Sequence, residues 1–296
     1  MPAYDRSAAY AQPVLRILDA RTGEPVPAAP ARRGLTRVEA RACGADPTAL
    51  RVLLTADLLV RALELGGTPV WATLAAPHDP AGLRTAATTL SIRPFEDAHD
   101  VTPGLGERQT LHVTSETPDA SGGGPVVWVA PVEWTGEVTG GQGADSAGHA
   151  PESTLSPASE SAPDRAPEPT ARPPAHPALL VLLSDPAALR LALLSVPRGE
   201  PVRLDSGVLE EAAGRLARWR RAVSGWARQP SRPVPDEVRA RLRSAWEDDL
   251  DLPGVLQVLR DVESAPELPD GARFETYVYA DRLLALDLAR DLGSRA

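Results

Sequence analysis

The chain has 296 residues, a net charge of −9 and a single cysteine. Its length allows one large domain or two smaller ones, and its acidic balance does not favour an obligate nucleic-acid-binding protein. One cysteine excludes an intrachain disulfide framework. All 31 basic residues are arginine, which excludes a phosphate-binding lysine and any mechanism that needs a lysine Schiff base.

The N-terminal stretch MPAYDRSAAYAQPV lacks the apolar segment of a signal peptide. No run of about 18 apolar residues, the length that spans a membrane, occurs anywhere in the sequence. A single cysteine is compatible with a reducing compartment. We therefore expect a cytoplasmic protein with no membrane contact.

The first of three regions, residues 1–135, mixes strand and helix signals. A strand is expected at 35–42, and Asp46 with Pro47 then forms the start of a helix that ends at Gly66-Gly67. A second strand at 68–75 completes a β-α-β unit with parallel strands. Two further apolar segments, 110–115 and 125–134, predict strands that are buried on both faces.

The middle region, 136–177, is rich in Gly, Ser, Ala, Pro and acidic residues. Only Val138 and Leu155 are aliphatic residues larger than alanine, so this stretch cannot bury a core. We expect a disordered linker here.

The last region, 178–296, is expected to be an all-α bundle. Each of its segments has one apolar stripe at helical spacing, which favours packing against neighbouring helices. The expected helices span 184–195, 206–227, 235–250, 252–263 and 271–293.

Motifs that bind phosphate, dinucleotide or zinc, or that present a nucleophilic serine, are absent from the sequence. Cys43 and the five scattered histidines have no ligand spacing, so we expect Cys43 to be a small buried thiol. The acidic run 246–251 is typical of a solvated helix end.

Residues 212–243 contain nine arginines against two acidic residues. Such a cluster either contacts a polyanion such as RNA or forms the polar face of two amphipathic helices. The candidates for contact with a polyanion are Arg215, Arg218, Arg220 and Arg221.

Three C-terminal segments resemble the helical region of two related class I synthetase-type enzymes. These segments are DPAALRLALLS (185–195), GVLEEAAGRLARWRRAV (207–223) and WEDDLDLPGVLQVLRDV (246–262). The enzymes are the bacterial cysteine–tRNA ligases and the actinobacterial mycothiol cysteine ligase. In them, a D-P-x-x-[IL]-R helix follows the catalytic core, and a "DDLD" segment opens a later helix.

The N-terminal half is similar to the same family over LRILDARTGEPVP (15–27), Cys43-Gly44 and ADLLVRALELGGTPV (56–70). The resemblance implies an α/β fold, with a shortened, degenerate Rossmann-like nucleotide-binding domain over 1–135. It also implies that Cys43 occupies the position of a zinc ligand, and that Gly44, Thr48 and Arg51 line a ligand pocket.

The sequence departs from the family at its catalytic motifs. No histidine occurs between Cys43 and Leu58, so the HIGH-type motif is missing, and a chain without lysine cannot contain a KMSKS loop. The other zinc ligands of the family have no counterpart. Losing one well-placed donor typically lowers the rate of such chemistry by about 10²–10³.

Three functional hypotheses remain. The first is a non-catalytic paralogue of the cysteine ligases that acts as a binding or regulatory module, with tRNA or a protein as the candidate partner and with no catalytic residue and no cofactor. The second is a divergent cysteine-activating ligase, which would need ATP and zinc. The third is a structural protein on the same scaffold.

Overall fold

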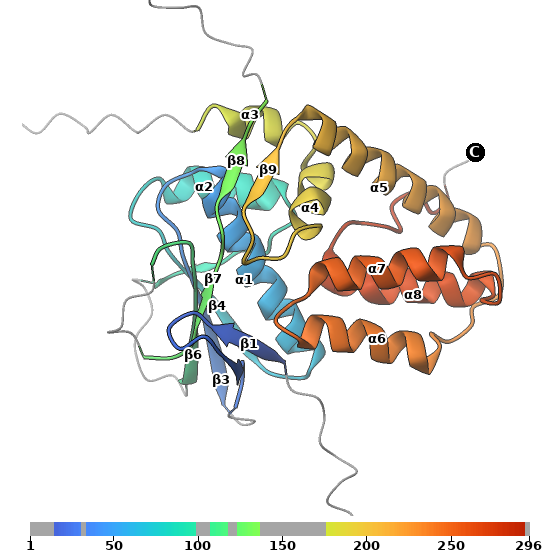
Figure 1. Ribbon diagram of the computed structural model, residues 1–296, viewed down its shortest axis with the longest axis horizontal. Coiled ribbons are helices and arrows are strands. Elements are labelled where there is room, and N and C mark those ends of the chain that lie inside the picture. Colours follow the sequence, from blue (N-terminus) through green and yellow to red (C-terminus); the bar gives the residue numbers. More distant parts are fainter. Residues whose placement is uncertain (1–14, 31–33, 99–106, 118–122, 137–175, 294–296) are drawn as a thin grey trace, which may run out of the picture.

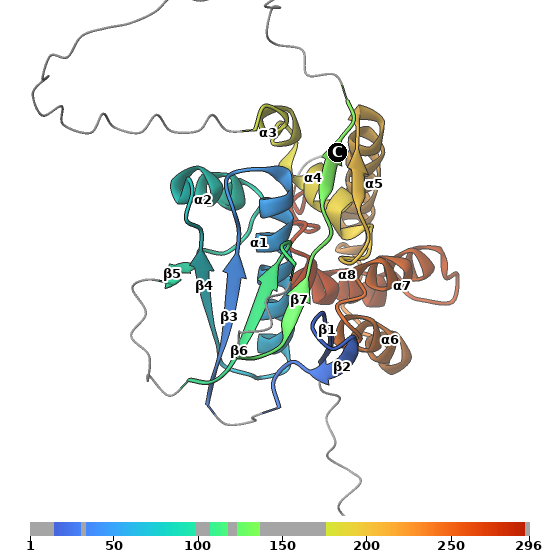
Figure 2. The same cartoon turned by 60° about the vertical axis from the view of Figure 1, so that its left-hand side comes forward.

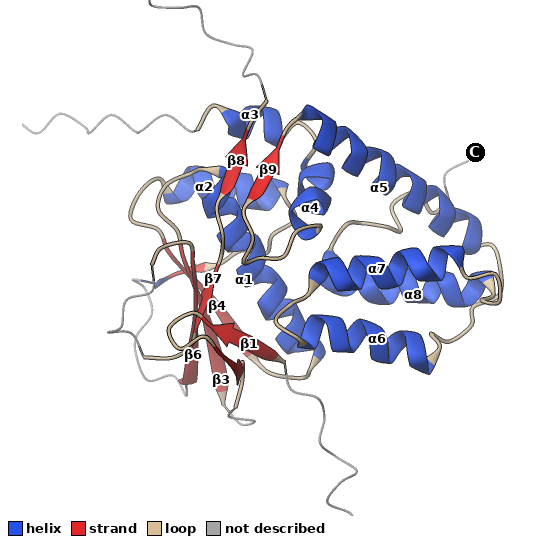
Figure 3. Cartoon of the chain, viewed as in Figure 1, coloured by secondary structure: helices blue, strands red, loops and turns tan. Residues whose placement is uncertain are grey.

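The computed structural model describes residues 15–30, 34–98, 107–117, 123–136 and 176–293 (Figure 1). A parallel sheet with two helices forms one side of the molecule, and a group of further helices forms the other (Figure 3). Nearly all of the expected linker, from 137 to 175, lies outside the described residues, so its disorder stays a prediction.

The sheet has five strands, and every neighbouring pair is parallel. Three of the expected strands are confirmed, at 35–41, 70–75 and 107–114. In spatial order the strands are β5 (Glu96–Asp97), β4 (Val70–Ala75), β3 (Leu35–Arg41), β6 (Glu107–Thr114) and β7 (Val126–Trp128).

Helix α1 (Pro47–Leu65) connects β3 to β4 and confirms the expected β-α-β unit. The Asp46 carboxylate accepts a hydrogen bond of 2.8 Å from the Ala49 amide, so Asp46 acts as the N-cap. The second connecting helix, α2 (Pro80–Thr89), joins β4 to β5. Its Arg84 forms an ion pair of 2.6 Å with Asp97 of β5.

The opposite face of the sheet is polar where α/β proteins usually place more helices. In Figure 2 α1 lies behind the sheet, and the face turned to the viewer carries no described helix. On this face the Glu39 carboxylate lies 2.7 Å from Nε of Arg41 and 3.3 Å from Nδ1 of His112. The neighbouring His112 side chain lowers the pKa of Glu39 to about 2, and Arg41 contributes in the same direction.

The C-terminal region contains six helices among its described residues. The expected helices at 184–195, 206–227, 235–250 and 252–263 are confirmed to within a few residues. The six are α3 (Ala178–Leu182), α4 (Pro186–Leu194), α5 (Ser206–Trp226), α6 (Asp236–Glu247), α7 (Leu252–Ser264) and α8 (Asp270–Leu284).

Helix α8 ends nine residues earlier than the sequence pattern predicts. Ala285 adopts a left-handed conformation with φ 48°, which ends the helix. The Asp281 carboxylate then accepts hydrogen bonds of 2.8 and 2.9 Å from the amides of Leu286 and Leu288. The apolar residues beyond 284 therefore pack into the core from an irregular segment rather than from a helix.

The last region is mostly helical, as expected, and contains one short strand among its described residues. Strand β9 (Val202–Leu204) pairs in parallel with β8 (Val132–Trp134), which belongs to the first region. The expected single strand over 125–134 is split because Pro131, which lacks an amide hydrogen, separates β7 from β8. The carbonyl of Pro131 accepts a hydrogen bond of 3.0 Å from the Val202 amide.

A short hairpin, β1 (Arg16–Asp19) and β2 (Glu24–Pro27), connects the sheet to the helices. The Asp19 carboxylate accepts a hydrogen bond of 3.0 Å from the Val126 amide of β7. On the other side, the Asp249 carboxylate accepts one of 2.8 Å from the Leu18 amide. The hairpin thus bridges β7 and the corner between α6 and α7.

A buried charge cluster at the centre of the molecule contains Asp57 of α1 and Arg190 of α4, each 1% exposed. Arg190 lies 3.3 Å from Asp57 and donates to the carbonyls of Leu90, at 2.8 Å, and Leu284, at 2.7 Å. Asp57 is also paired with Arg61 at 2.8 Å and Arg93 at 3.0 Å. Burial lowers the pKa of Arg190 to about 10, so the guanidinium stays charged at neutral pH.

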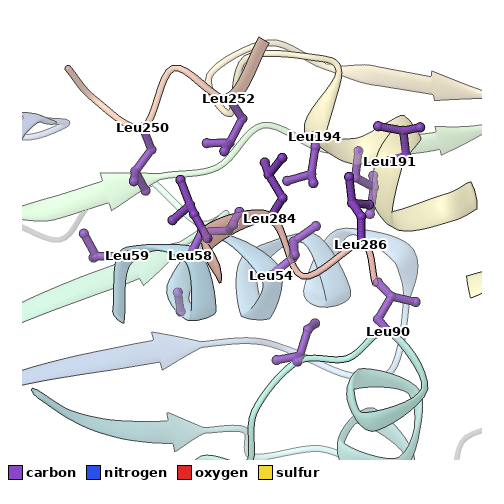
Figure 4. Packing of buried hydrophobic residues seen from close by; sticks show 14 of the residues in the cluster. Leu54, Leu58, Leu59, Leu90, Leu191, Leu194, Leu250, Leu252, Leu284 and Leu286 are labelled. Atoms are coloured by element: carbon purple, nitrogen blue, oxygen red, sulfur yellow. The ribbon is translucent and has the colours of Figure 1, made fainter. Parts of the chain in front are cut away.

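Leucine side chains surround this cluster. Figure 4 shows residues of α1 facing residues of α4 and of the segment that follows α8. The leucines named there include Leu54, Leu58, Leu191, Leu194, Leu284 and Leu286, all at most 3% exposed. Within the described residues, every helix is too short or too polar to cross a membrane.

Replacing Asp57 by alanine should lower the free energy of unfolding by about 3–5 kcal/mol, because Arg190 would remain buried without its carboxylate. Urea unfolding followed by circular dichroism would measure the difference. Arg203→Ala is the matched control, since Arg203 forms an ion pair with Glu133 but its side chain is 79% exposed, and its loss should change stability by about 0–1 kcal/mol. Equal effects of the two substitutions would contradict a central role for Asp57.

Glu39→Gln should destabilise the protein by about 1–3 kcal/mol at pH 7, because a neutral amide replaces the charged acceptor beside His112 and Arg41. The folded-state pKa of Glu39 lies below its ordinary value of 4.5. The carboxylate therefore stabilises the fold above pH 4.5 and loses this contribution as the pH falls towards 2. Unfolding curves at several pH values should show the difference from wild type shrinking across that range, and a difference that stays constant from pH 7 to pH 2 would contradict this role of Glu39.

Candidate functional site

The order of the strands defines one place where a ligand is expected. After β3, the chain adds β4 and β5 on one side of it in the sheet. The next strand, β6, pairs with β3 on its other side. In open α/β sheets, ligands bind beyond the carboxyl ends of the strands where the strand order reverses. In this protein that point lies beyond β3 and β6, at Cys43-Gly44 and Ser115.

Cys43 lies at this point, and its side chain is exposed. The expectation of a small buried thiol is therefore wrong, because the turn directs the residue away from the core while Ala42 before it is buried. Gly44 has φ +86°, a left-handed conformation that favours glycine, so the sharp turn between β3 and α1 requires this residue.

Thr48, in the first turn of α1, has a structural contact. Its hydroxyl accepts a hydrogen bond of 3.0 Å from the Val132 amide at the start of β8. Thr48 thus holds the segment after β7 against the helix that follows Cys43.

Arg51 is buried and bound to the protein backbone. Its side chain is 2% exposed and donates to four carbonyl oxygens, of Ala130 (2.9 Å), Glu200 (2.6 Å), Val196 (3.4 Å) and Pro197 (2.7 Å). Burial, with Arg198 nearby, lowers the pKa of Arg51 to about 10. Arg51 therefore joins α1 to β8 and to the loop before β9, and its part in binding a ligand stays a prediction.

The residues around Cys43 do not fit a zinc site. Across the part of the chain that the structure describes, no three His, Cys, Asp or Glu side chains gather closely enough to hold a metal ion. Structural and catalytic zinc sites need three or four such ligands. Among the described residues, Cys43 therefore has too few neighbouring ligands to hold a zinc ion.

The four arginines proposed as polyanion contacts lie along α5 but have different surroundings. Arg215 pairs with Glu211 at 2.7 Å, and Arg218 pairs with Glu263 at 3.3 Å. Arg220 donates to the carbonyls of Leu286 and Asp287, and among the described residues Arg221 donates only to the carbonyl of Ala217 in its own helix. Internal partners thus use much of this charge, and contact with tRNA or another polyanion stays a prediction.

Sequence reasoning missed the residues that join the two halves of the molecule, although the motifs pointed to their positions. Arg190 ends the D-P-x-x-[IL]-R segment, and Asp57 begins the D-x-L-x-R pattern of α1. In the "DDLD" segment, Asp249 forms an ion pair with Arg198. Asp251 caps α7 by accepting a hydrogen bond of 2.9 Å from the Gly254 amide.

Two cavities of several hundred Å³ do not include Cys43 among their lining residues. One, of about 410 Å³, lies beside Gln109, Thr110 and Gly124 near the middle of β6. The other, of about 490 Å³, lies along α6 and is lined by arginines and acidic residues, among them Arg16, Arg243 and Glu247. Neither contains a residue that the sequence predicts to bind a ligand.

No protein-family model matches the chain. Several curated proteins named L-cysteine:1D-myo-inositol 2-amino-2-deoxy-alpha-D-glucopyranoside ligase are similar to it. The Streptomyces griseus protein is 47% identical over 72 residues, which is 24% of this chain and 17% of that protein. The proteins of Parafrankia sp. and Mycolicibacterium smegmatis are 42% identical over 94 residues and 43% identical over 75 residues.

These matches cover 32% and 25% of this chain, respectively. The chain spans only 17–20% of the length of the relatives that it matches. The parallel sheet and the helical region agree with the fold that the resemblance implies. The chain therefore resembles the mycothiol cysteine ligases of the class I synthetase type, over about a quarter to a third of its own length.

Proposed function

We propose that this protein is a non-catalytic paralogue of the cysteine ligases that acts as a binding or regulatory module. The observation that carries the proposal is the environment of Arg51. Arg51 is the only basic residue between Cys43 and Leu58, and its guanidinium is bound to four backbone carbonyls.

The chemistry of amino-acid activation explains why this observation matters. Adenylate formation places negative charge on the transferring phosphate, and enzymes stabilise that charge with positioned cations and hydrogen-bond donors. The chain has no lysine, and the helix that follows Cys43 has no histidine. A guanidinium that is 2% exposed cannot approach the phosphates of a bound nucleotide without leaving its carbonyl partners.

The contacts of the motif residues support the same proposal. Four charged residues in the family-like segments hold helices and loops together. They are Asp57, Arg190, Asp249 and Asp251. A sequence that keeps these structural residues and lacks the phosphate-binding ones is expected to keep the fold of the family without its catalytic activity. The carboxyl edge of the sheet beside Cys43 is the place where this scaffold would bind a ligand or partner.

A divergent cysteine-activating ligase is the second candidate. The exposed thiol of Cys43 favours it, because this side chain reaches solvent at the reversal of strand order, where a substrate would bind. The two candidates differ in one measurable property, the cysteine-dependent activation of ATP.

We expect the purified protein to show no exchange of pyrophosphate into ATP that depends on L-cysteine, because the only basic residue between Cys43 and Leu58 is Arg51, which is buried and bound to backbone carbonyls. The assay should use the Mycolicibacterium smegmatis relative at the same enzyme concentration as the positive control. Exchange clearly above a heat-treated sample would contradict the proposal.

Cys43→Ala decides what such an exchange would mean. If wild-type protein were active and Cys43→Ala were inactive while keeping its circular dichroism spectrum, the second candidate would be correct. If both proteins exchanged pyrophosphate equally, the activity would come from a contaminant or from another site, and repurification over a second column would separate these sources.

A further inference from the structure

A small cavity lies where α1, α4 and the start of α7 meet, and it has a volume of about 20 Å³. Most of its lining is leucine, and Figure 4 shows Leu54 and Leu58 from α1, Leu194 from α4, and Leu250 and Leu252 at the start of α7. A cavity of this size exceeds the roughly 10–15 Å³ that one water molecule needs.

Two guanidinium groups also line this cavity, those of Arg51 and Arg198. Within the part of the chain that the structure describes, the hydrogen-bond partners of Arg51 are neutral carbonyls. Arg198 is paired with Asp249 and donates to the Trp128 carbonyl at 2.6 Å. Its side chain is 10% exposed, and its Nε is buried without a hydrogen-bond partner in the described part of the chain.

The two cations at the cavity share one directly paired carboxylate. Asp249 forms an ion pair with Arg198, whereas Glu200 binds Arg51 through its backbone carbonyl, and its exposed carboxylate attracts Arg51 without forming an ion pair. Burial and the proximity of Arg198 lower the pKa of Arg51 to about 10. A buried, unpaired charge is costly in an apolar surrounding, and a counter-ion would offset that cost.

We propose that this cavity binds one small monovalent anion of the size of chloride, held by Arg198 Nε and by the charge of Arg51. The volume of about 20 Å³ favours a halide over phosphate, sulfate or a nucleotide, all of which are larger. The mostly apolar lining lowers the local dielectric constant and strengthens the attraction between the anion and the guanidinium groups. The ion would join α1 of the sheet region to α4 and α7 of the helical region.

The first test compares thermal unfolding in sodium chloride, sodium bromide and sodium gluconate at equal ionic strength. A bound halide stabilises the folded state according to its concentration and dissociation constant, and we expect chloride and bromide to raise Tm by about 2–5 °C over gluconate, with saturation. Arg198→Met should abolish the difference between the salts. Arg203→Met, which removes an exposed arginine, should leave it unchanged.

The second test needs no variant. Crystals of the wild-type protein grown in sodium bromide should give an anomalous scattering peak within the cavity, close to Arg198 Nε. Equal Tm values in the three salts, together with a water molecule or no density in the cavity, would overturn the proposal. Halide stabilisation that persists in Arg198→Met would place the ion elsewhere and would overturn it as well.

Discussion

The pairing of Asp57 with Arg190 is the interaction on which the rest of this structure depends. A buried ion pair is tolerated only when further hydrogen bonds satisfy both groups. Here Arg190 also binds the carbonyls that end α2 and α8, and Asp57 also binds Arg61 and Arg93. One arginine thereby fixes the positions of α1, α2, α4 and α8, because none of them can move without leaving a buried group unpaired.

The same logic explains what the chain shares with the cysteine ligases. Its family-like aspartates and arginines cap helices, hold turns and join the sheet to the helices, as Asp249 does through Leu18 and Arg198. These contacts depend on the relative positions of the elements and not on a substrate. A protein can therefore lose the groups that act on phosphate and still keep these residues.

The sequence predicts the main helices because Asp46 with Pro47 marks the start of α1 and apolar stripes mark the extents of the others, and the structure adds Asp185 and Asp251 as N-caps of α4 and α7. It does not predict β9, since three residues between two helices carry no periodic signal and pair only because β8 lies alongside. The role of Arg51 is equally hidden. A sequence shows the charge, but the carbonyls that bind it come from segments about 80 and 150 residues away.

The parallel pair of β8 and β9 has a consequence for how the molecule is assembled. The two strands come from opposite sides of residues 137–175, and Arg51 and Arg198 reinforce the same junction with bonds to both halves. The part before residue 137 contributes β8 and the part after residue 175 contributes β9, so neither part alone can form the backbone hydrogen bonds of this strand pair. The two parts of the chain therefore behave as complementary fragments of one cooperative unit, and a single cut between them would leave a non-covalent complex rather than two independent domains.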